Sequence, residues 1–254
     1  MLSEIVVSGG DLSVSALMLI SVLAFLTFVV SSAVGIGGTL VLVPVLIFFI
    51  PAAQAVAVTA PVMLINNCIK LSVFHAHVRW RSALWAALPA WPCAAFAATY
   101  THVVEESVLR MAIASVIAVY FFVEFAFKLK LKIEYRGLIP FGIATGLASG
   151  FCGAAGVPAA FAYRAHGLVK ESFVGTISVI AIGLQLSKIP VYSSTNLISV
   201  TDIPFILLLG LTSFCGILTG KRVLKKLSPR FFRIVLDALL GSLAVWLFVS
   251  GLSN

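Results

Sequence analysis

The sequence has few charged residues. Asp, Glu, Lys and Arg make up 10% of its 254 residues, whereas they make up about a quarter of a soluble domain. Hydrophobic residues make up 61%, and the mean hydropathy is +1.14. Several apolar runs are long enough to cross a hydrocarbon core of about 30 Å, which takes about 20 helical residues. This composition excludes a soluble globular domain and predicts an all-α integral membrane protein in contact with membrane lipid.

The sequence also lacks the motifs of common enzyme classes. It contains no HExxH, no G-x-S-x-G and no P-loop. Its four cysteines stand singly within apolar runs, at Cys68, Cys93, Cys152 and Cys215. Isolated cysteines of this kind are typical of small buried thiols, so we expect no disulfide, no metal site and no cofactor. The net charge of +8 lies mainly at the ends of apolar runs, which membrane topology explains without a nucleic-acid partner.

The apolar runs predict six single helices and two interrupted stretches. We expect membrane-crossing helices at about 53–74, 83–101, 107–127, 172–189, 203–220 and 231–252. The other two stretches, at about 12–50 and 137–163, contain the glycine-rich sequences GIGG and GFCGAAG. Glycine costs about 1 kcal/mol relative to alanine within a helix, so each cluster predicts a break.

The charges of the connections predict the orientation. Basic residues gather around Arg79, around Arg136 and around Lys225, whereas the connections at Glu105–Glu106 and Asp202 carry few positive charges. Short cytoplasmic loops carry the excess of Lys and Arg. We therefore expect a multi-pass protein of the cell inner (plasma) membrane with its basic loops in the cytoplasm and both termini outside.

This orientation makes each interrupted stretch return to the face from which it starts. Segment 137–163 is too short to cross twice, so we expect a hairpin of two short helices that meet near the middle of the membrane. Segment 12–50 follows the same rule, although its first arm, 12–34, is long enough to cross the membrane fully.

The two halves of the sequence, 1–132 and 133–254, resemble each other. SSAVGIGGTLVLVP parallels ASGFCGAAGVPAAF, and the helices that follow also align. The alignment pairs Gly35 with Gly153, Gly38 with Gly156, Thr59 with Thr176 and, after one inserted residue, Asn67 with Gln185 and Lys70 with Lys188. Each half holds a broken hairpin and three crossing helices. Because three is odd, the second half enters from the opposite face, which is the inverted-repeat plan of many secondary transporters.

The breaks themselves predict a binding site. The second half-helix of each hairpin is expected to begin near Gly38 and Thr39 or near Gly156. Such a start presents N–H groups without partners and the positive end of the helix dipole. Two inverted hairpins would aim two such ends at the midplane, which suits a small anion. The alternative is that these glycines only allow close helix packing or a kink.

Polar side chains after the hairpins are further candidates for the site. They are Thr59, Asn66, Asn67, Thr176 and Gln185. In a membrane such groups either hydrogen-bond a bound oxyanion or link neighbouring helices. Adjacent helical positions point in different directions, so we expect only one of Asn66 and Asn67 to face a pore.

Two lysines and two histidines lie near the ends of apolar runs. We expect Lys70 and Lys188 to snorkel to the membrane interface, with an electrostatic funnel for anions as the alternative. His75 and His77 are two residues apart and therefore point away from each other on a helix. Interfacial polar residues describe them better than a metal site or a proton relay.

The glycine-rich break, Pro44, Thr59 and their second-half counterparts resemble the TauE/SafE family of sulfite exporters over about 12–250. The resemblance implies an integral plasma-membrane carrier for sulfur-containing anions such as sulfite, sulfoacetate or related organosulfonates. It also implies substrate-facing breaks, carried over by position to Gly35, Gly37, Gly38, Gly153 and Gly156. Ala155 stands where the family more often has glycine.

The sequence thus predicts a transporter that exposes a midplane anion site alternately to the two sides of the membrane. An anion channel with the same lining is the first alternative. A membrane enzyme that uses His75, His77 and Asn67 is the second, although no catalytic motif supports it. A purely structural scaffold would leave the paired breaks unexplained. The sequence indicates no oligomeric state.

Overall fold

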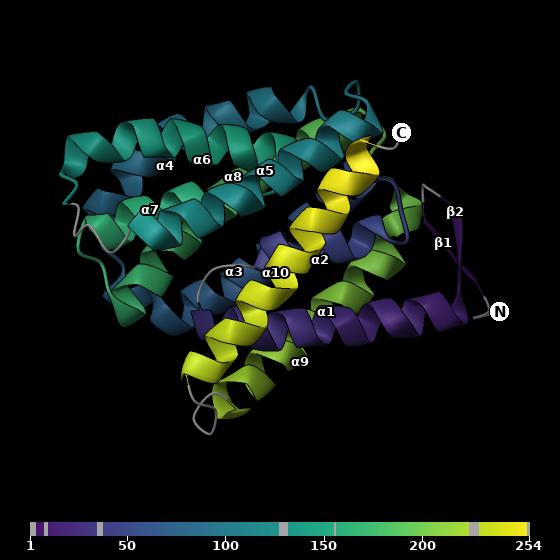
Figure 1. Ribbon diagram of the computed structural model, residues 1–254. Helices are drawn as coiled ribbons and strands as arrows, with labels where there is room; N and C mark the ends of the chain where they lie inside the picture. The colour runs from purple at the N-terminus through teal and green to yellow at the C-terminus, as the bar shows by residue number, and fades with distance from the viewer. Residues whose placement is uncertain are drawn as a thin grey trace.

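The computed structural model describes residues 4–7, 10–34, 38–126, 132–154, 156–223 and 229–252. This part of the chain contains ten α-helices and one pair of strands (Figure 1). The helices are α1 (Val14–Val34), α2 (Gly38–Ile47), α3 (Ala52–Phe74), α4 (Trp80–Ala98), α5 (Glu106–Ala126), α6 (Leu138–Cys152), α7 (Gly156–Ala165), α8 (Lys170–Ser194), α9 (Ile203–Val223) and α10 (Pro229–Leu252). Short 3-10 helices are η1 (His75–His77), η3 (Tyr135–Gly137) and η4 (Val200–Asp202).

Three helical segments of the described residues are apolar and long enough to cross a membrane. They are Ala52–His77, Glu171–Ser194 and Val200–Gly220. With the other apolar helices they form the helical membrane protein that the composition predicts.

The N-terminal strands were not predicted from the sequence. β1 (Glu4–Val7) pairs antiparallel with β2 (Gly10–Ser13), so that Ile5 lies opposite Leu12. The segment EIVV is rich in β-branched residues, which favour strands. The strand pair contacts η4 and α9, and α1 begins directly after it.

Three helices depart from their predicted bounds by three residues or more, and one of them is α9, which ends at Val223 and not at 220. α4 begins at Trp80, before the predicted 83. α8 continues to Ser194, beyond the predicted 189, with Pro190 inside the helix. Proline lacks the N–H of a helical hydrogen bond, but membrane helices tolerate it where neighbouring groups satisfy the freed carbonyl. Pro190 therefore does not end α8.

One end of the bundle is defined by contacts of Glu106 and η4, and we call it the Glu106 end. The carboxylate of Glu106 accepts hydrogen bonds from the N–H of Ala52, with N···O distances of 2.8 and 3.0 Å. The Nε2 of Gln54 donates to Asp202 in η4. A Cβ built at Gly251 would lie 3.1 Å from the carbonyl oxygen of Ser107, so α10 ends here as well. The strands and the C-terminus thus lie at the same end (Figure 1).

The opposite end holds the start of α4, and we call it the Arg81 end. There the N–H of Arg79 donates to the Oγ1 of Thr176 at 3.0 Å. A Cβ built at Gly175 would lie 2.8 Å from the carbonyl oxygen of Phe74. The end of α3 therefore lies beside the start of α8, and the two helices run antiparallel.

The segment from α6 to α7 is a hairpin whose two ends meet at the Arg81 end. The N–H of Ile133 donates to the carbonyl oxygen of Ala165, with an N···O distance of 3.0 Å. The Nδ1 of His166 donates to the carbonyl oxygen of Ile133 at 2.7 Å. The second interrupted stretch thus starts and ends at one end of the bundle, which is the arrangement that the loop charges predicted.

The break in this hairpin is not at the middle of the bundle. Gly153 has a φ of 71°, the left-handed conformation that glycine adopts readily. A Cβ built there would lie 3.3 Å from Val43 and 3.5 Å from Val56. Val56 lies one turn, about 6 Å, from the start of α3. The 15 residues of α6 extend about 22 Å, so the break lies nearer the Glu106 end than the Arg81 end. Its depth in the membrane stays a prediction.

The first predicted break, at Gly35 and Gly37, lies outside the described residues. α1 packs on α9, since a Cβ built at Gly216 would lie 2.6 Å from the Cβ of Phe28. The two helices run in the same direction, because both begin beside the strand pair. The 21 residues of α1 extend about 31 Å, so this arm is as long as a full crossing. α2 is a short arm of ten residues whose C-terminus leads back to the Glu106 end.

α6 packs on α4 through glycines that allow the two backbones to touch. The glycines are spaced by four residues and face alanines with the same spacing: Gly142 meets Ala86, Gly146 meets Ala90 and Gly150 meets Ala94. A Cβ built at any of the three would lie 2.2–2.3 Å from an alanine carbonyl oxygen. Small residues at this spacing are the usual means of close helix packing in membranes. The ladder fixes α6 against α4 along its length.

Candidate functional site

The turn between α6 and α7 is buried inside the protein. Cys152, Gly153 and Ala154 are all buried, and the first buried residue of α7 is Val157. The turn closes with a hydrogen bond from the N–H of Gly153 to the carbonyl oxygen of Ser149 at 3.0 Å. The broken helix therefore faces protein and not lipid, as a break at membrane depth requires.

Lys188 of α8 contacts the C-terminal end of α6. Its side chain is 1% exposed, and its Nζ donates to both the carbonyl oxygen and the Oγ of Ser149, each at 3.1 Å. The last carbonyl groups of a helix lack intrahelical partners and carry partial negative charge. The ammonium group offsets that charge at the break. The prediction that Lys188 snorkels to the interface is therefore wrong.

Two further side chains hold the same helix end. The hydroxyl of Tyr192 donates to the carbonyl oxygen of Gly150, and the Oγ1 of Thr101 donates to that same oxygen at 3.0 Å. The ring of Tyr192 lies 6.0 Å from the Nζ of Lys188. These partners come from α8 and from the connection after α4, so the sequence around the break does not reveal them.

The charge of Lys188 has no carboxylate partner among the described residues. There, Arg110 and Glu106 form an ion pair at 3.1 Å, and Lys188 contacts the neutral groups of Ser149 and Tyr192. Moving a charge out of water costs several kcal/mol unless other groups compensate it. A negative ligand bound beside Lys188 would offset that cost, whereas a cation would add to it.

The two aligned threonines do not meet. Thr59 and Thr176 are both buried. The Oγ1 of Thr59 donates to the carbonyl oxygen of Ala55 in its own helix at 2.6 Å, whereas the Oγ1 of Thr176 accepts from the N–H of Arg79. Thr59 lies toward the start of α3 at the Glu106 end, and Thr176 lies toward the start of α8 at the Arg81 end.

The amide side chains of α3 and α8 are mostly buried. The Nδ2 of Asn66 donates to the Oγ of Ser213 in α9 at 2.8 Å, and the Nδ2 of Asn67 donates to Met63 in its own helix. The Oδ1 of Asn66 and the Oε1 of Gln185 have no hydrogen-bond partner within the described part of the chain. A buried acceptor without a partner costs about 1–3 kcal/mol. A water molecule or a protonated ligand would satisfy these two oxygens.

Other predicted residues lie in several places. Gly38 is buried, Thr39 and Lys70 are half-buried, and His75 and His77 are exposed. Gly35 and Gly37 lie outside the described residues, and Gly156 opens α7. The residues that the structure describes include no group of three potential metal ligands.

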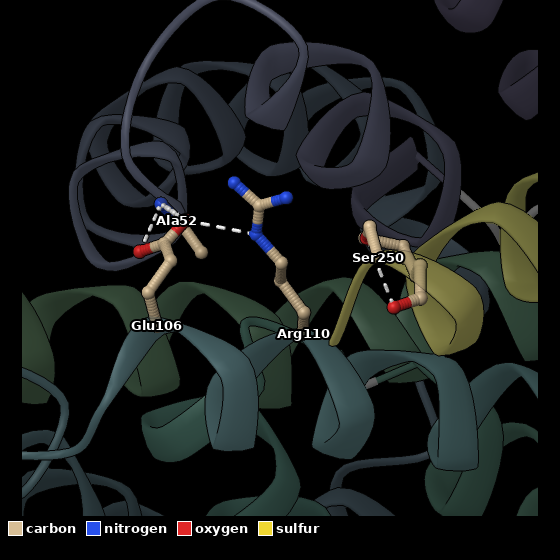
Figure 2. A network of polar contacts seen from close by, with 5 residues as sticks. Ala52, Glu106, Arg110 and Ser250 are labelled. Carbon is tan, nitrogen blue, oxygen red and sulfur yellow. Dashed lines mark hydrogen bonds and ion pairs between the residues drawn. The ribbon is translucent and has the colours of Figure 1, made fainter. Parts of the chain in front are cut away.

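The cysteines and one surface contact differ from expectation. Cys152 is buried, but Cys68 and Cys215 are exposed on the protein, so the prediction of four buried thiols is wrong for these two. Glu106 was predicted only as a loop charge, yet its carboxylate caps α3 and pairs with Arg110 (Figure 2). Hydropathy does not distinguish a cysteine that faces lipid from one that faces protein.

Comparison with known proteins gives one match. The model of the family described as Sulfite exporter TauE/SafE matches residues 20–247. No curated protein matches the chain, and no solved structure matches it. The match begins within α1, ends within α10 and includes the residues around the α6 break.

Proposed function

The chain belongs to the TauE/SafE family of sulfite exporters, and on that premise we propose that it carries a small sulfur-containing anion across the plasma membrane. Sulfite, sulfoacetate and related organosulfonates are the proposed substrates. One interior site opens alternately to the two sides of the membrane. The observation that carries this proposal is the buried side chain of Lys188, whose Nζ lies beside the α6 break.

We further propose that the chain is built from two inverted repeats, 1–132 and 133–254. The contacts between helices support this, because α1 packs on α9 as α6 packs on α4. If the two halves are exchanged, α1 takes the place of α6 and α9 takes the place of α4, so each of these pairs becomes the other. The exchange leaves the pair α3 and α8 and the pair α5 and α10 unchanged. The antiparallel course of α3 and α8 fits an inversion.

The proposed site lies between the two short arms. The start of α7 at Gly156 and the start of α2 at Gly38 supply N–H groups, and Lys188 supplies charge. Thr59, Thr176, Asn66, Asn67 and Gln185 are the proposed polar lining, reached as the hairpins move during the transport cycle. The N–H groups of a helix start and an ammonium group are the donors that an oxyanion requires.

The proposed orientation places the Arg81 end in the cytoplasm. Basic residues of two separate connections gather at this end, near Arg79 and near Arg136, whereas Glu105 and Asp202 belong to the Glu106 end. An excess of Lys and Arg marks cytoplasmic loops. Both chain termini would then lie outside.

A counterflow experiment tests the transport proposal. The purified protein is reconstituted into liposomes that contain unlabelled sulfite, and the entry of labelled sulfite is followed. A carrier accelerates this entry relative to empty liposomes, because the loaded site returns faster than the empty one. A channel shows no acceleration, and an enzyme alters the labelled compound. Stabilisation of the protein by cationic or zwitterionic compounds alone would refute the anion proposal.

A further inference from the structure

A second group of cations lines a cavity at the Arg81 end, far from the α6 break. The cavity has a volume of about 840 Å³, which lies within the range of about 300–1,000 Å³ that is typical of ligand sites. Its walls are formed by the first turns of α4, by the connection before α6 and by the turn after α7. The lining residues are Arg81, Trp85, Lys132, Ile133, Glu134, Tyr135, Arg136, Ala165, His166 and Gly167.

The cavity carries an excess of positive charge. Arg81, Lys132 and Arg136 line it together with a single carboxylate, that of Glu134. Within the described part of the chain, none of these four side chains forms an ion pair. All three cations are exposed, and together they give the cavity a positive potential. Such a potential attracts a small anion.

The walls of the cavity are held in place by other contacts. The guanidinium carbon of Arg81 lies 4.7 Å from the centre of the Tyr135 ring, in cation–π contact. The Tyr135 ring packs edge-on against His166, with 4.6 Å between the ring centroids. His166 in turn bonds to Ile133. Arg81 of α4 is thereby fixed against the base of the α6–α7 hairpin.

We propose that this cavity binds an oxyanion of the phosphate or sulfonate type. The planar guanidinium groups of Arg81 and Arg136 each offer paired N–H donors that match such an oxyanion, and Lys132 adds a third positive charge. The preference for basic cytoplasmic loops explains why cations occur at this end. It does not explain why cations from segments more than 50 residues apart in the chain line one cavity with Trp85 and Tyr135.

Two sources supply this chemistry. Basic pockets between membrane helices, with Trp and Tyr at the interface, suit the headgroup of an anionic phospholipid. A soluble sulfur oxyanion offers the same charged oxygens. The proposal concerns a site distinct from Lys188 and does not depend on the proposed transport activity, since it is tested by binding. A ligand here would contact both ends of the hairpin and the start of α4.

Thermal unfolding of the purified protein tests the proposal. The soluble probes are sodium sulfite and inorganic phosphate in neutral detergent, compared with sodium chloride at the same ionic strength, because salt alone screens charges. The lipid probe is phosphatidylglycerol, added to nanodiscs of phosphatidylcholine. We expect at least one probe to raise the unfolding temperature, since a ligand that binds only the folded state stabilises it.

Matched variants test whether the stabilisation by a probe arises from binding in this cavity. Arg81→Gln and Arg136→Gln remove donors from the cavity, whereas Arg79→Gln removes an exposed charge two residues away that does not line it. Each cavity variant should raise the Kd of the active probe about tenfold, because it loses a charged hydrogen bond. Arg79→Gln should leave that Kd unchanged.

The outcomes distinguish a soluble anion from a lipid headgroup, and both from the absence of specific binding in the cavity. Stabilisation by sulfite or phosphate identifies a soluble ligand, and stabilisation by phosphatidylglycerol alone identifies a lipid. No stabilisation by any probe, or equal losses in the Arg79 and cavity variants, overturns the proposal. Counterflow of sulfite by the cavity variants in neutral lipid is measured in parallel. Its absence in the native protein would refute the transport proposal and leave the binding result intact.

Discussion

Lys70 and Lys188 occupy matching positions in the two halves of the sequence but have different surroundings. Lys70 is half-buried, one turn before the end of α3 at the Arg81 end. Lys188 is 1% exposed and holds the end of α6 through Ser149. The two halves thus share a helix plan, but only the second places its lysine at a helix break that the structure describes.

The broken helix explains this difference. α6 ends in the protein interior, where its last carbonyl groups need donors, and α8 passes beside that end. Among the described residues, no broken helix end lies beside Lys70. The start of α3, the helix that carries Lys70, is capped by Glu106 of α5. Equivalent positions in a repeat therefore predict equivalent helices, whereas the partners of a side chain depend on which helix end packs against it.

Replacing each lysine by methionine tests this difference most strongly. Lys188→Met removes the positive charge at the α6 break, and we expect the rate of sulfite counterflow to fall about a hundredfold, which is about 2.7 kcal/mol. Lys70→Met should change the rate less than threefold. The unfolding temperature of both variants serves as the control, because removal of a buried charge without a carboxylate partner need not destabilise the protein. Equal losses in the two variants would contradict a special role for Lys188.

Close packing of α6 on α4 is tested by adding a methyl group. The Cβ of Gly146→Ala would meet the carbonyl oxygen of Ala90 at 2.2 Å, whereas that of Gly210→Ala meets the end of the Ile65 side chain at 2.9 Å. Gly146→Ala should lower the free energy of unfolding by about 2 kcal/mol through overpacking. Gly210→Ala should change it by less than about 1 kcal/mol, because alanine favours the helix. Thermal unfolding in detergent measures both, and equal effects would show that the ladder does not fix α6.

The aligned threonines give a smaller contrast. Thr176→Val leaves the N–H of Arg79 without its acceptor, and we expect a loss of about 1 kcal/mol in unfolding free energy. Thr59→Val removes only a bond within its own helix, so its effect on stability should be near zero. Denaturant or thermal unfolding of the two variants checks the order. A larger loss for Thr59→Val would reverse the comparison.

The capping carboxylate gives the smallest effect. Glu106→Gln keeps an acceptor for Ala52 but removes the negative charge at the start of α3, and we expect a loss of about 0.5 kcal/mol. Glu105→Gln changes an exposed neighbour and serves as the control. Because salt screens such interactions, the difference between the variants should shrink at high ionic strength. Thermal unfolding at low and high salt measures it, and a difference that persists at high salt would refute the dipole explanation.

Local sequence features predicted much of the fold. Hydropathy located the long helices, since a membrane span requires a continuous apolar run. The glycine clusters indicated interruptions, and the segment from α6 to α7 turns back at Gly153. The apolar run predicted that α8 ends at 189, whereas the helix continues through Pro190 to Ser194, because a packed membrane helix tolerates proline.

The candidate site was only partly predictable. The sequence singled out Lys188, Thr176 and Gln185, but it gave Lys188 an interfacial position. Ser149 and Tyr192 were not predicted at all, because their roles arise from contacts about 40 residues apart in the chain. The cavity at the Arg81 end depends in the same way on segments that no periodicity connects.

By itself the sequence determined a helical membrane protein with basic and acidic connections in alternation, because the cost of burying polar groups in lipid acts on each segment separately. Only the tertiary structure decided that Lys188 binds the broken end of α6, that this break lies near the Glu106 end, and that Arg81 joins the base of the hairpin. The physical reason is that contact with lipid requires each spanning segment to be helical and apolar, whereas the packing of helices against one another determines which polar groups meet.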